Sequence, residues 1–266
     1  MTKLDHLTDL LPQDHPWGKT IHCFDTLPST NNLAKEMAAQ GAPEGTVIIA
    51  REQTGGRGRM GRSFSSPAGL GLYLSVILRP KCAPKELMHL TCAAGIACTD
   101  AVEKAALFRP GIKWANDLVH GKRKLGGILT ELGFDSQGNA AWAVVGIGIN
   151  CLHESKDFPE EIRPIAASLS MAAKKSITPL DLARHLIPAL YEMRQSLFDA
   201  KSIMARYRRD CITLGQEICV SRAGITRYGK ALSVDDDASL TVEFSDGSTE
   251  AVASGEVSLR GMYGYL

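Results

Sequence analysis

The sequence has no pair of cysteines at the spacing of a metal site. Its seven cysteines are odd in number and scattered along the 266 residues, and no two form a CxxC motif. No pair of histidines completes a zinc pattern either. A disulfide framework and a structural metal are therefore not expected, and reduced thiols in a cytosolic protein are the simpler interpretation.

Neither sign of charge is in excess. Lys and Arg number 30 against 29 Asp and Glu, a net charge of +1, and only 6% of the residues are aromatic. Proteins that coat nucleic acids or lie on membrane surfaces carry a clear excess of basic residues. Such partners are therefore not expected, although a sum of charges leaves open a local charged site.

Long apolar runs are also missing. The N-terminus, MTKLDHLTDLLPQDHPWGK, has acidic and polar residues where a signal peptide needs an apolar core. The most apolar segment, Leu90–Cys98, stops at Asp100 and is too short to cross a bilayer. We therefore expect a soluble, cytoplasmic protein with no membrane partner.

What the chain does have is enough apolar material for a packed core. A hydrophobic fraction of 44% and a mean hydropathy of -0.06 are ordinary for a globular protein. Polar Ser29–Asn32 predicts a helix start, and Gly41 ends that helix. Residue patterns predict strands at 46–51, 72–80, 112–114, 124–132 and 141–151, the last two as a hairpin, and helices at 86–107, 180–198 and 202–209. This mixture predicts an α+β sheet with helices on one face.

After about Leu214 the chain changes to short strand-like runs separated by Gly, Asp and Ser. That spacing predicts a small antiparallel β-barrel of about five strands. We therefore divide the chain into a polar, loosely structured leader over residues 1–20, a main domain over 21–213 and a C-terminal domain over 214–266.

The most informative segment is QTGGRGRMGR, residues 53–62. Its glycines allow the backbone to approach a ligand closely. Arg57, Arg59 and Arg62 bring into one short loop the guanidinium groups that bind carboxylate and phosphate. The spacing fits neither GxGxxG nor a Walker A loop. On local evidence alone, a flexible solvated loop or an RNA-binding arginine–glycine segment explains it equally well.

Three further motifs are weak when taken singly. KWANDL, residues 113–118, places Asn116 and Asp117 where a strand gives way to a turn, which is more often structural than catalytic. Lys124 begins an apolar strand, where a lysine is usually a surface charge. GIGIN, residues 146–150, has glycines inside a strand and ends in Asn150; a ligand, another backbone or a tight bend would explain it.

Taken in order, these motifs are specific. STNN (29–32), QTGGRGRMGR, KWANDL, KLGGILTE (124–131), GIGIN and the terminal GEVSLR (255–260) together resemble the biotin protein ligase family, over about residues 24–260. The resemblance implies a class-II-synthetase-like mixed sheet followed by an SH3-like barrel. It implies that biotin and ATP, with Mg²⁺, give biotinyl-5′-AMP and pyrophosphate. Biotin then passes to one lysine of a biotin carboxyl carrier protein.

The resemblance also implies roles for individual residues. Those matching biotin-binding positions are Ser29, Thr30, Asn31, Gln53, Gly56, Arg57, Gly58 and Lys124. Those matching nucleotide-binding positions are Arg57, Arg59, Arg62, Asn116 and Asn150. The implied catalytic residues are Lys124, which would bridge the biotin carboxylate and the α-phosphate, Arg59, and Asp117, which would orient the acceptor ammonium group. No residue is implied as a dedicated metal ligand.

Three positions depart from the pattern of the family. Met60, Ala115 and Phe64 stand where Arg, Pro and Trp are usual. Met60 lowers the charge of the loop and so affects its closing more than its chemistry. Ala115 loses a restraint on φ without removing a functional group.

Other functions remain as alternatives. A lipoate or octanoate ligase or transferase would use the same sheet with a different acyl pocket. An RNA-binding protein would spread basic and aromatic residues over one face, which the balanced charge and few aromatics disfavour. A transcriptional regulator would need an N-terminal DNA-binding domain, and the 28 residues before Ser29 are too few, so DNA binding is not expected. Monomer and homodimer are both left open.

Overall fold

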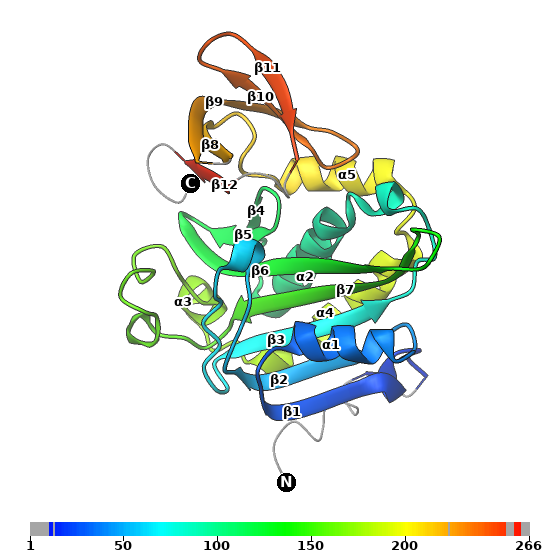
Figure 1. Cartoon of the computed structure of the whole chain (residues 1–266). Helices are drawn as coiled ribbons and strands as arrows, with labels where there is room; N and C mark the ends of the chain where they lie inside the picture. Colours follow the sequence, from blue (N-terminus) through cyan, green and yellow to red (C-terminus); the bar gives the residue numbers. More distant parts are fainter. Residues whose placement is uncertain (1–10, 13, 223, 254–257, 262–266) are drawn as a thin grey trace.

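The structure, a computed structural model, describes residues 11–12, 14–222 and 224–253 and the backbone of 258–261. Most of the predicted leader and the start of GEVSLR therefore lie outside the described residues. The described chain forms a seven-stranded mixed sheet with helices on it and a smaller five-stranded antiparallel sheet (Figure 1).

The seven-stranded sheet has the strand order β1-β2-β3-β7-β6-β5-β4. Its strands are β1 (Ile21–Leu27), β2 (Val47–Gln53), β3 (Gly71–Leu78), β4 (Gly111–Lys113), β5 (Asp117–His120), β6 (Arg123–Phe134) and β7 (Ala140–Asn150). β1 and β2 are parallel and the other neighbours are antiparallel. Since parallel neighbours need a crossover connection, helix α1 (Thr30–Ala39) joins β1 to β2 across one face of the sheet.

Helices lie on both faces of this sheet. The opposite face is covered by α2 (Leu90–Ala106) and α4 (Pro179–Gln195), with α3 (Leu169–Ala173) and α5 (Ala200–Asp210) beside them (Figure 1). Short 3-10 helices occupy Gly18–Thr20, Arg59–Gly61, Pro84–Leu87 and Ser155–Asp157. None of the described helices combines the length and the apolar character needed to cross a membrane.

Strand alternation separates the two faces. In β2, Val47 and Ile49 belong to the main core, whereas the intervening Ile48 packs with Ala34 and Ala38 of α1. The expectation of helices on one face only was therefore wrong, because the β1–β2 crossover places α1 on the other. α1 covers only part of that face and leaves the ends of β6 and β7 open.

Most of the elements predicted from residue patterns are confirmed. The helix start at Ser29 is present, and its hydroxyl accepts a hydrogen bond from the backbone N of Asn32 at 3.5 Å. The hairpin is β6–β7, and the three predicted longer helices are α2, α4 and α5. The patterns missed β1 and α3, and they missed that Asp117 starts a strand, β5.

The described end of the leader is packed rather than loose, contrary to our expectation. Trp17 is only 4% exposed and meets Tyr191 of α4 edge to face, with ring centroids 5.5 Å apart. Its indole fills the space above Gly45, where a Cβ would lie 2.0 Å from the ring. Burial of Trp17 and Leu11 removes apolar surface from water, which offsets the cost of ordering this segment.

The second sheet has the order β11-β10-β9-β8-β12 and is antiparallel throughout. Its strands are β8 (Glu217–Arg222), β9 (Ile225–Val234), β10 (Leu240–Phe244), β11 (Thr249–Val252) and β12 (Ser258–Gly261). Five short antiparallel strands were predicted and are confirmed. The predicted barrel is not closed among the described residues, because the short edge strands β11 and β12 stand at opposite ends of the order and no ladder joins them.

The second sheet is attached to the turn between β4 and β5. The indole Nε1 of Trp114 donates to the carbonyl oxygen of Ala238 at 3.0 Å, and its backbone N donates to Thr213 Oγ1 at 2.9 Å. The hydroxyl of Tyr207 in α5 donates to the carbonyl of Ala115 at 3.2 Å. These contacts fix the backbone that leads into Asn116 and Asp117.

Candidate active site

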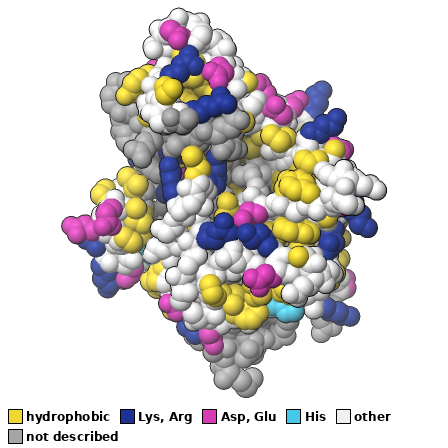
Figure 2. All heavy atoms as spheres, viewed as in Figure 1, with side chains coloured by type: hydrophobic (Ala, Val, Ile, Leu, Met, Phe, Trp, Pro, Cys, Tyr) yellow, Lys and Arg dark blue, Asp and Glu magenta, His cyan; other side chains and the backbone are white. Residues whose placement is uncertain are grey.

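The part of the sheet that α1 leaves open carries a cleft of about 570 Å³. Its lining comes from the loop after β2, the ends of β6 and β7, the β4–β5 turn and the segment after β7. Figure 2 shows Lys and Arg side chains gathered on this face of the molecule, below the C-terminal sheet. The volume is that of a small-molecule site.

The floor of the cleft is open because β7 alternates isoleucine with glycine. Ile147 and Ile149 point into the main core, so Gly146 and Gly148 face the cleft. A Cβ on Gly146 would lie 1.9 Å from Asn31 Oδ1, and one on Gly148 would lie 2.7 Å from the ring of Phe64. The glycines of GIGIN therefore admit neighbouring side chains to the floor rather than forming a bend.

The arginine-rich segment forms a hairpin-like loop over the cleft. Its two arms are joined by hydrogen bonds from Gln53 N to Ser66 O at 3.1 Å, Phe64 N to Gly56 O at 2.9 Å and Gly58 N to Arg62 O at 2.7 Å. A Cβ on Gly56 would lie 2.3 Å from the carbonyl oxygen of Phe64, so only glycine fits there. The tip is left-handed, with φ of 54° at Met60 and 73° at Gly61.

One end of the cleft is a buried network of neutral polar groups. Gln53 Oε1 accepts from the backbone N of Thr30 at 2.8 Å and from its hydroxyl at 3.1 Å. The hydroxyl of Ser75 lies 2.8 Å from Thr30 Oγ1 and 2.6 Å from Asn31 Oδ1. Ser29, Thr30 and Asn31 are each less than 5% exposed. Four residues predicted from the sequence thus meet here, positioned by the start of α1 and the end of β2.

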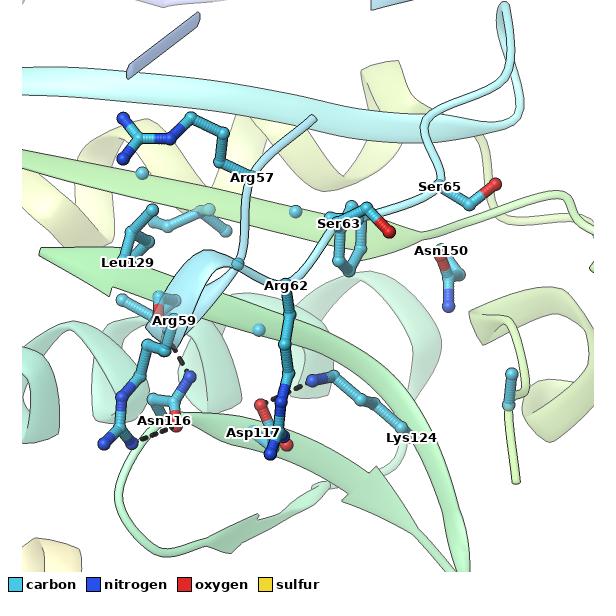
Figure 3. Close-up of a pocket in the computed structure, with 18 of the residues that line it drawn as sticks. Arg57, Arg59, Arg62, Ser63, Ser65, Asn116, Asp117, Lys124, Leu129 and Asn150 are labelled. Carbon is cyan, nitrogen blue, oxygen red and sulfur yellow. Dashed lines mark hydrogen bonds and ion pairs between the residues drawn. The ribbon is translucent and has the colours of Figure 1, made fainter. Parts of the chain in front are cut away.

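The middle of the cleft is charged (Figure 3). Lys124 Nζ donates to Asp117 Oδ1 at 2.6 Å, across the β5–β6 ladder. Arg59 Nη1 donates to Asn116 Oδ1 at 2.8 Å, and Asn116 Nδ2 donates to the carbonyl of Ile128 at 3.0 Å. In Figure 3 the side chain of Arg62 extends toward Asp117 and Lys124. The structure therefore brings together all three predicted catalytic residues.

Burial changes the electrostatics of this cluster. Desolvation lowers the pKa of the Arg59 guanidinium below its ordinary value, and the negative charge of Asp117 opposes that shift. An arginine remains cationic in proteins even when its pKa falls. A partly desolvated cation binds an incoming anion strongly, because less water screens the pair.

Arg57 lies apart from the cluster to which the sequence analysis assigned it. Its Nη1 donates to Asn32 Oδ1 at 2.8 Å and to Glu131 Oε1 at 3.2 Å. Figure 3 shows its guanidinium pointing away from Lys124 and Asp117. The structure thus brings Arg59 and Arg62 to the charged centre and Arg57 to the edge of the polar end.

The other end of the cleft is largely apolar. Asn150 is 6% exposed, and its Nδ2 donates to the carbonyl of Ala167 at 3.1 Å. Beside it, the segment after β7 lines the cleft with Phe158, Ile162, Ile165 and Ala166. Two hydrogen bonds with the backbone of Lys124 hold this segment: Lys124 N to Ile165 O at 2.7 Å and Ala167 N to Lys124 O at 2.9 Å.

Several residues in or beside the cleft were not predicted from the sequence. The apolar residues after Asn150 gave no signal beyond their spacing. Ser75 could have been noticed as a single hydroxyl in the apolar run LYLSVIL, and Glu131 as the acid that ends KLGGILTE. Neither position indicates a site until the strands are paired.

Comparisons with known proteins agree with this geometry. Residues 23–150 match the Biotin/lipoate A/B protein ligase family. The bifunctional ligase/repressor BirA of Bacillus subtilis is 34% identical over 235 residues, which are 86% of this chain and 71% of that protein. The biotin–[acetyl-CoA-carboxylase] ligase of Mycobacterium tuberculosis is 32% identical over 239 residues, 86% of this chain and 85% of that protein.

A solved structure extends the likeness to the whole fold. The biotin protein ligase of Aquifex aeolicus, in complex with biotin and ATP, matches 91% of this chain and 99% of its own with a TM-score of 0.77 and 27% identity. The ordered motifs and the extent of these matches lead to one conclusion. The chain belongs to the biotin protein ligase family.

Proposed function

We propose that this chain activates biotin with ATP and transfers it to a lysine of a biotin carboxyl carrier protein. The observation that carries the proposal is the layout of the cleft. A buried neutral polar end, suited to an uncharged hydrogen-bonding ring, adjoins a cationic centre, and an apolar end follows. Family membership and the ligands of the Aquifex protein, biotin and ATP, support the same pair of substrates.

The polar end would bind the ureido ring of biotin. That ring has one carbonyl acceptor and two N–H donors. The side chains of Ser29, Thr30, Asn31 and Gln53 offer both hydrogen-bond donors for the carbonyl and acceptors for the N–H groups. Buried polar groups that are already mutually hydrogen-bonded hold their directions before the ligand arrives. Gly56 and Gly58 keep the loop backbone close enough to cover the ring.

The first step must bring two anions together. An oxygen of the biotin carboxylate attacks the α-phosphorus of ATP, the bond to the β-phosphate bridging oxygen breaks, and pyrophosphate leaves. Lys124 would lie between the carboxylate and the α-phosphate, and Arg59 and Arg62 would balance the charge that develops on the phosphate oxygens. Asn116 positions Arg59 through their 2.8 Å hydrogen bond. Asn150 and its apolar neighbours would receive the adenine.

The second step needs an uncharged amine. The acceptor lysine nitrogen attacks the carbonyl carbon of biotinyl-5′-AMP, and AMP leaves with the bonding electrons. Asp117, which already accepts a hydrogen bond from one ammonium group, would orient the incoming ammonium and take its proton. Both steps use oxygen and nitrogen nucleophiles of the substrates, so no protein nucleophile is required.

Mg²⁺ would enter with ATP. In the part of the chain that the structure describes, no group of three or more His, Cys, Asp or Glu could hold a metal ion. Mg²⁺ is commonly bound through substrate phosphates and water with few protein ligands, and it would neutralise the leaving pyrophosphate. We place the reaction in the cytoplasm, as a monomer or homodimer, without a role for DNA.

The decisive test is direct. The whole protein is incubated with biotin, ATP, Mg²⁺ and a biotin carboxyl carrier domain, and the mass of the acceptor is measured. We expect the mass of one added biotin, dependent on ATP, and none when the acceptor lysine is replaced by arginine. A parallel reaction with lipoate separates the related ligases: an acceptor modified by lipoate and not by biotin would overturn the proposal.

A further inference from the structure

Glu131 takes no part in the chemistry proposed above, yet it is the most heavily engaged carboxylate beside the cleft. Its Oε1 accepts from Lys35 Nζ at 2.8 Å and from Arg57 Nη1 at 3.2 Å, and its Oε2 accepts from Asn31 Nδ2 at 3.0 Å. The side chain is 21% exposed. One carboxylate therefore holds two cations and an amide.

The three partners belong to two different parts of the site. Asn31 and Lys35 lie in α1, and Asn31 is tied to the floor of the polar end through its hydrogen bond with Ser75. Arg57 is the first arginine of the loop that covers the cleft. Glu131, on β6, thus links the loop to the polar floor, beside Asn32 of α1, whose Oδ1 accepts from Arg57 Nη1 at 2.8 Å.

The charges favour this attachment. Burial would raise the pKa of the Glu131 carboxyl, but the hydrogen bonds from Lys35 and Asn31 and the positive charge of Arg57 together lower it. The carboxylate is therefore ionised at neutral pH. A hydrogen bond to a charged group contributes more than one between neutral groups, so a neutral residue here would hold Arg57 less firmly.

We propose that Glu131 is a positioning residue, which anchors the arginine loop over the polar end of the cleft by holding Arg57 and Asn31 on one carboxylate. The anchor acts on the loop whether or not a ligand is bound. Its effect on biotin rests on the proposed function, whereas its effect on the loop does not.

The first experiment measures the loop in the ligand-free whole protein, as the rate of subtilisin cleavage within residues 53–66. We expect Glu131→Gln, which keeps the shape and removes the charge, to increase this rate about 10-fold. Lys35→Gln is the matched control, since it removes a partner of Glu131 that is not in the loop, and its rate should stay within about twofold of wild type. An unchanged rate in Glu131→Gln would overturn the proposal.

A double-mutant cycle removes the ambiguity of a folding defect. Arg57→Gln breaks the same contact from the loop side together with the Arg57–Asn32 hydrogen bond, so the double variant should be cleaved no faster than Arg57→Gln alone. Additive increases would contradict the anchor. Thermal unfolding of each variant confirms that the compared proteins are folded.

A second readout concerns the ligand. We expect Glu131→Gln to weaken biotin binding, measured by calorimetry, about 10-fold while the KM for ATP stays within about twofold, and Glu131→Asp to recover part of the affinity. Equal losses for both substrates would contradict a positioning role at the polar end. If the wild-type protein binds no biotin, the proposed function fails, and the cleavage rates still test the anchor.

Discussion

Along β7, neighbouring residues serve opposite sides of the large sheet. Ile147 and Ile149 belong to the main core, whereas Gly146 and Gly148 face the cleft and leave room there for Asn31 and Phe64. By alternating two residue types, the same strand thus presents isoleucine side chains to the core on one face and bare backbone on the other. The missing side chains of the two glycines leave room on the cleft face of β7, while the isoleucines on its other face pack into the core.

The two sides also differ in how their charges are paired. On the helix side, Arg109 contacts three carboxylates, those of Asp100, Glu103 and Asp210, and joins α2 to α5. The cleft lining has one acid, Asp117, and five basic residues: Arg57, Arg59, Arg62, Lys113 and Lys124. An arginine surrounded by carboxylates of its own chain is structural, and a lining with excess cations is prepared for an anion.

The largest expected effect separates chemistry from folding. Lys124→Ala should reduce the formation of biotinyl-adenylate about 10³-fold, because the charge between the two anions is lost, and should leave the melting temperature near that of wild type. The control is Lys122→Ala, which removes an exposed lysine from the turn between β5 and β6. Pyrophosphate release at a near-normal rate from folded Lys124→Ala would remove this assignment.

Two substitutions, one on each face of β7, test the difference between those faces. Gly146→Ala should weaken biotin binding about 10- to 100-fold, because its Cβ would collide with Asn31. Ile149→Ala should cost about 2–5 kcal/mol of unfolding free energy with biotin binding retained, because Ile149 is buried in the core and does not line the cleft, so its truncation opens a cavity in the core. Calorimetry measures biotin binding and urea unfolding measures stability for both variants. If both variants change in the same way, the two faces of β7 do not have separate roles.

A smaller effect is expected for retention of the intermediate. Arg59→Gly removes the cation that Asn116 positions over the charged centre, and should release biotinyl-5′-AMP about 10-fold faster. Rapid quenching and filtration measure the free intermediate against time, with Arg51→Gly, outside the cleft on β2, as the control. An unchanged rate of release of biotinyl-5′-AMP would show that Arg59 does not retain the intermediate.

The smallest expected effect is a dependence of stability on pH. His153 is 1% exposed and stacked on Phe158 at 5.0 Å, and burial lowers its pKa below the ordinary 6.5, with Asp157 opposing the shift. The unfolded chain therefore binds the proton more readily than the folded chain does. The stability contributed by neutral, buried His153 is present above pH 6.5 and is lost as the pH falls toward the lowered pKa. His153→Phe keeps the stack and should flatten the fall in melting temperature between pH 7 and pH 5.

How much the sequence could predict depends on the range of the interaction. Local patterns identified the helix that Ser29 starts and the strands of the β6–β7 hairpin, because caps and alternation act over a few residues. They did not place α1 on the second face of the sheet, since that follows from the parallel pairing of β1 with β2. The patterns left the closure of the barrel unspecified for a similar reason: strand spacing does not reveal which edges meet.

The same limit applies within the site. The resemblance supplied most of the polar and charged residues that line the cleft, and the structure brings Lys124, Arg59 and Asp117 together. Their roles stay predictions until measured. Sequence order grouped Arg57 with Arg59, but a hairpin-like loop sends their guanidinium groups to different neighbours. Glu131 meets Arg57 from 74 positions away, so no local pattern could connect them.

The hydrogen bond from Trp114 to Ala238 bears on how far this chain can be divided. A shortened chain that ends before Glu217 would expose the indole and remove one of the three hydrogen bonds that fix the backbone leading to Asn116 and Asp117. The second sheet is therefore not an appendage that can be exchanged freely. A fusion or transplant of the region before Glu217 would need another segment that covers Trp114 and accepts its indole hydrogen bond.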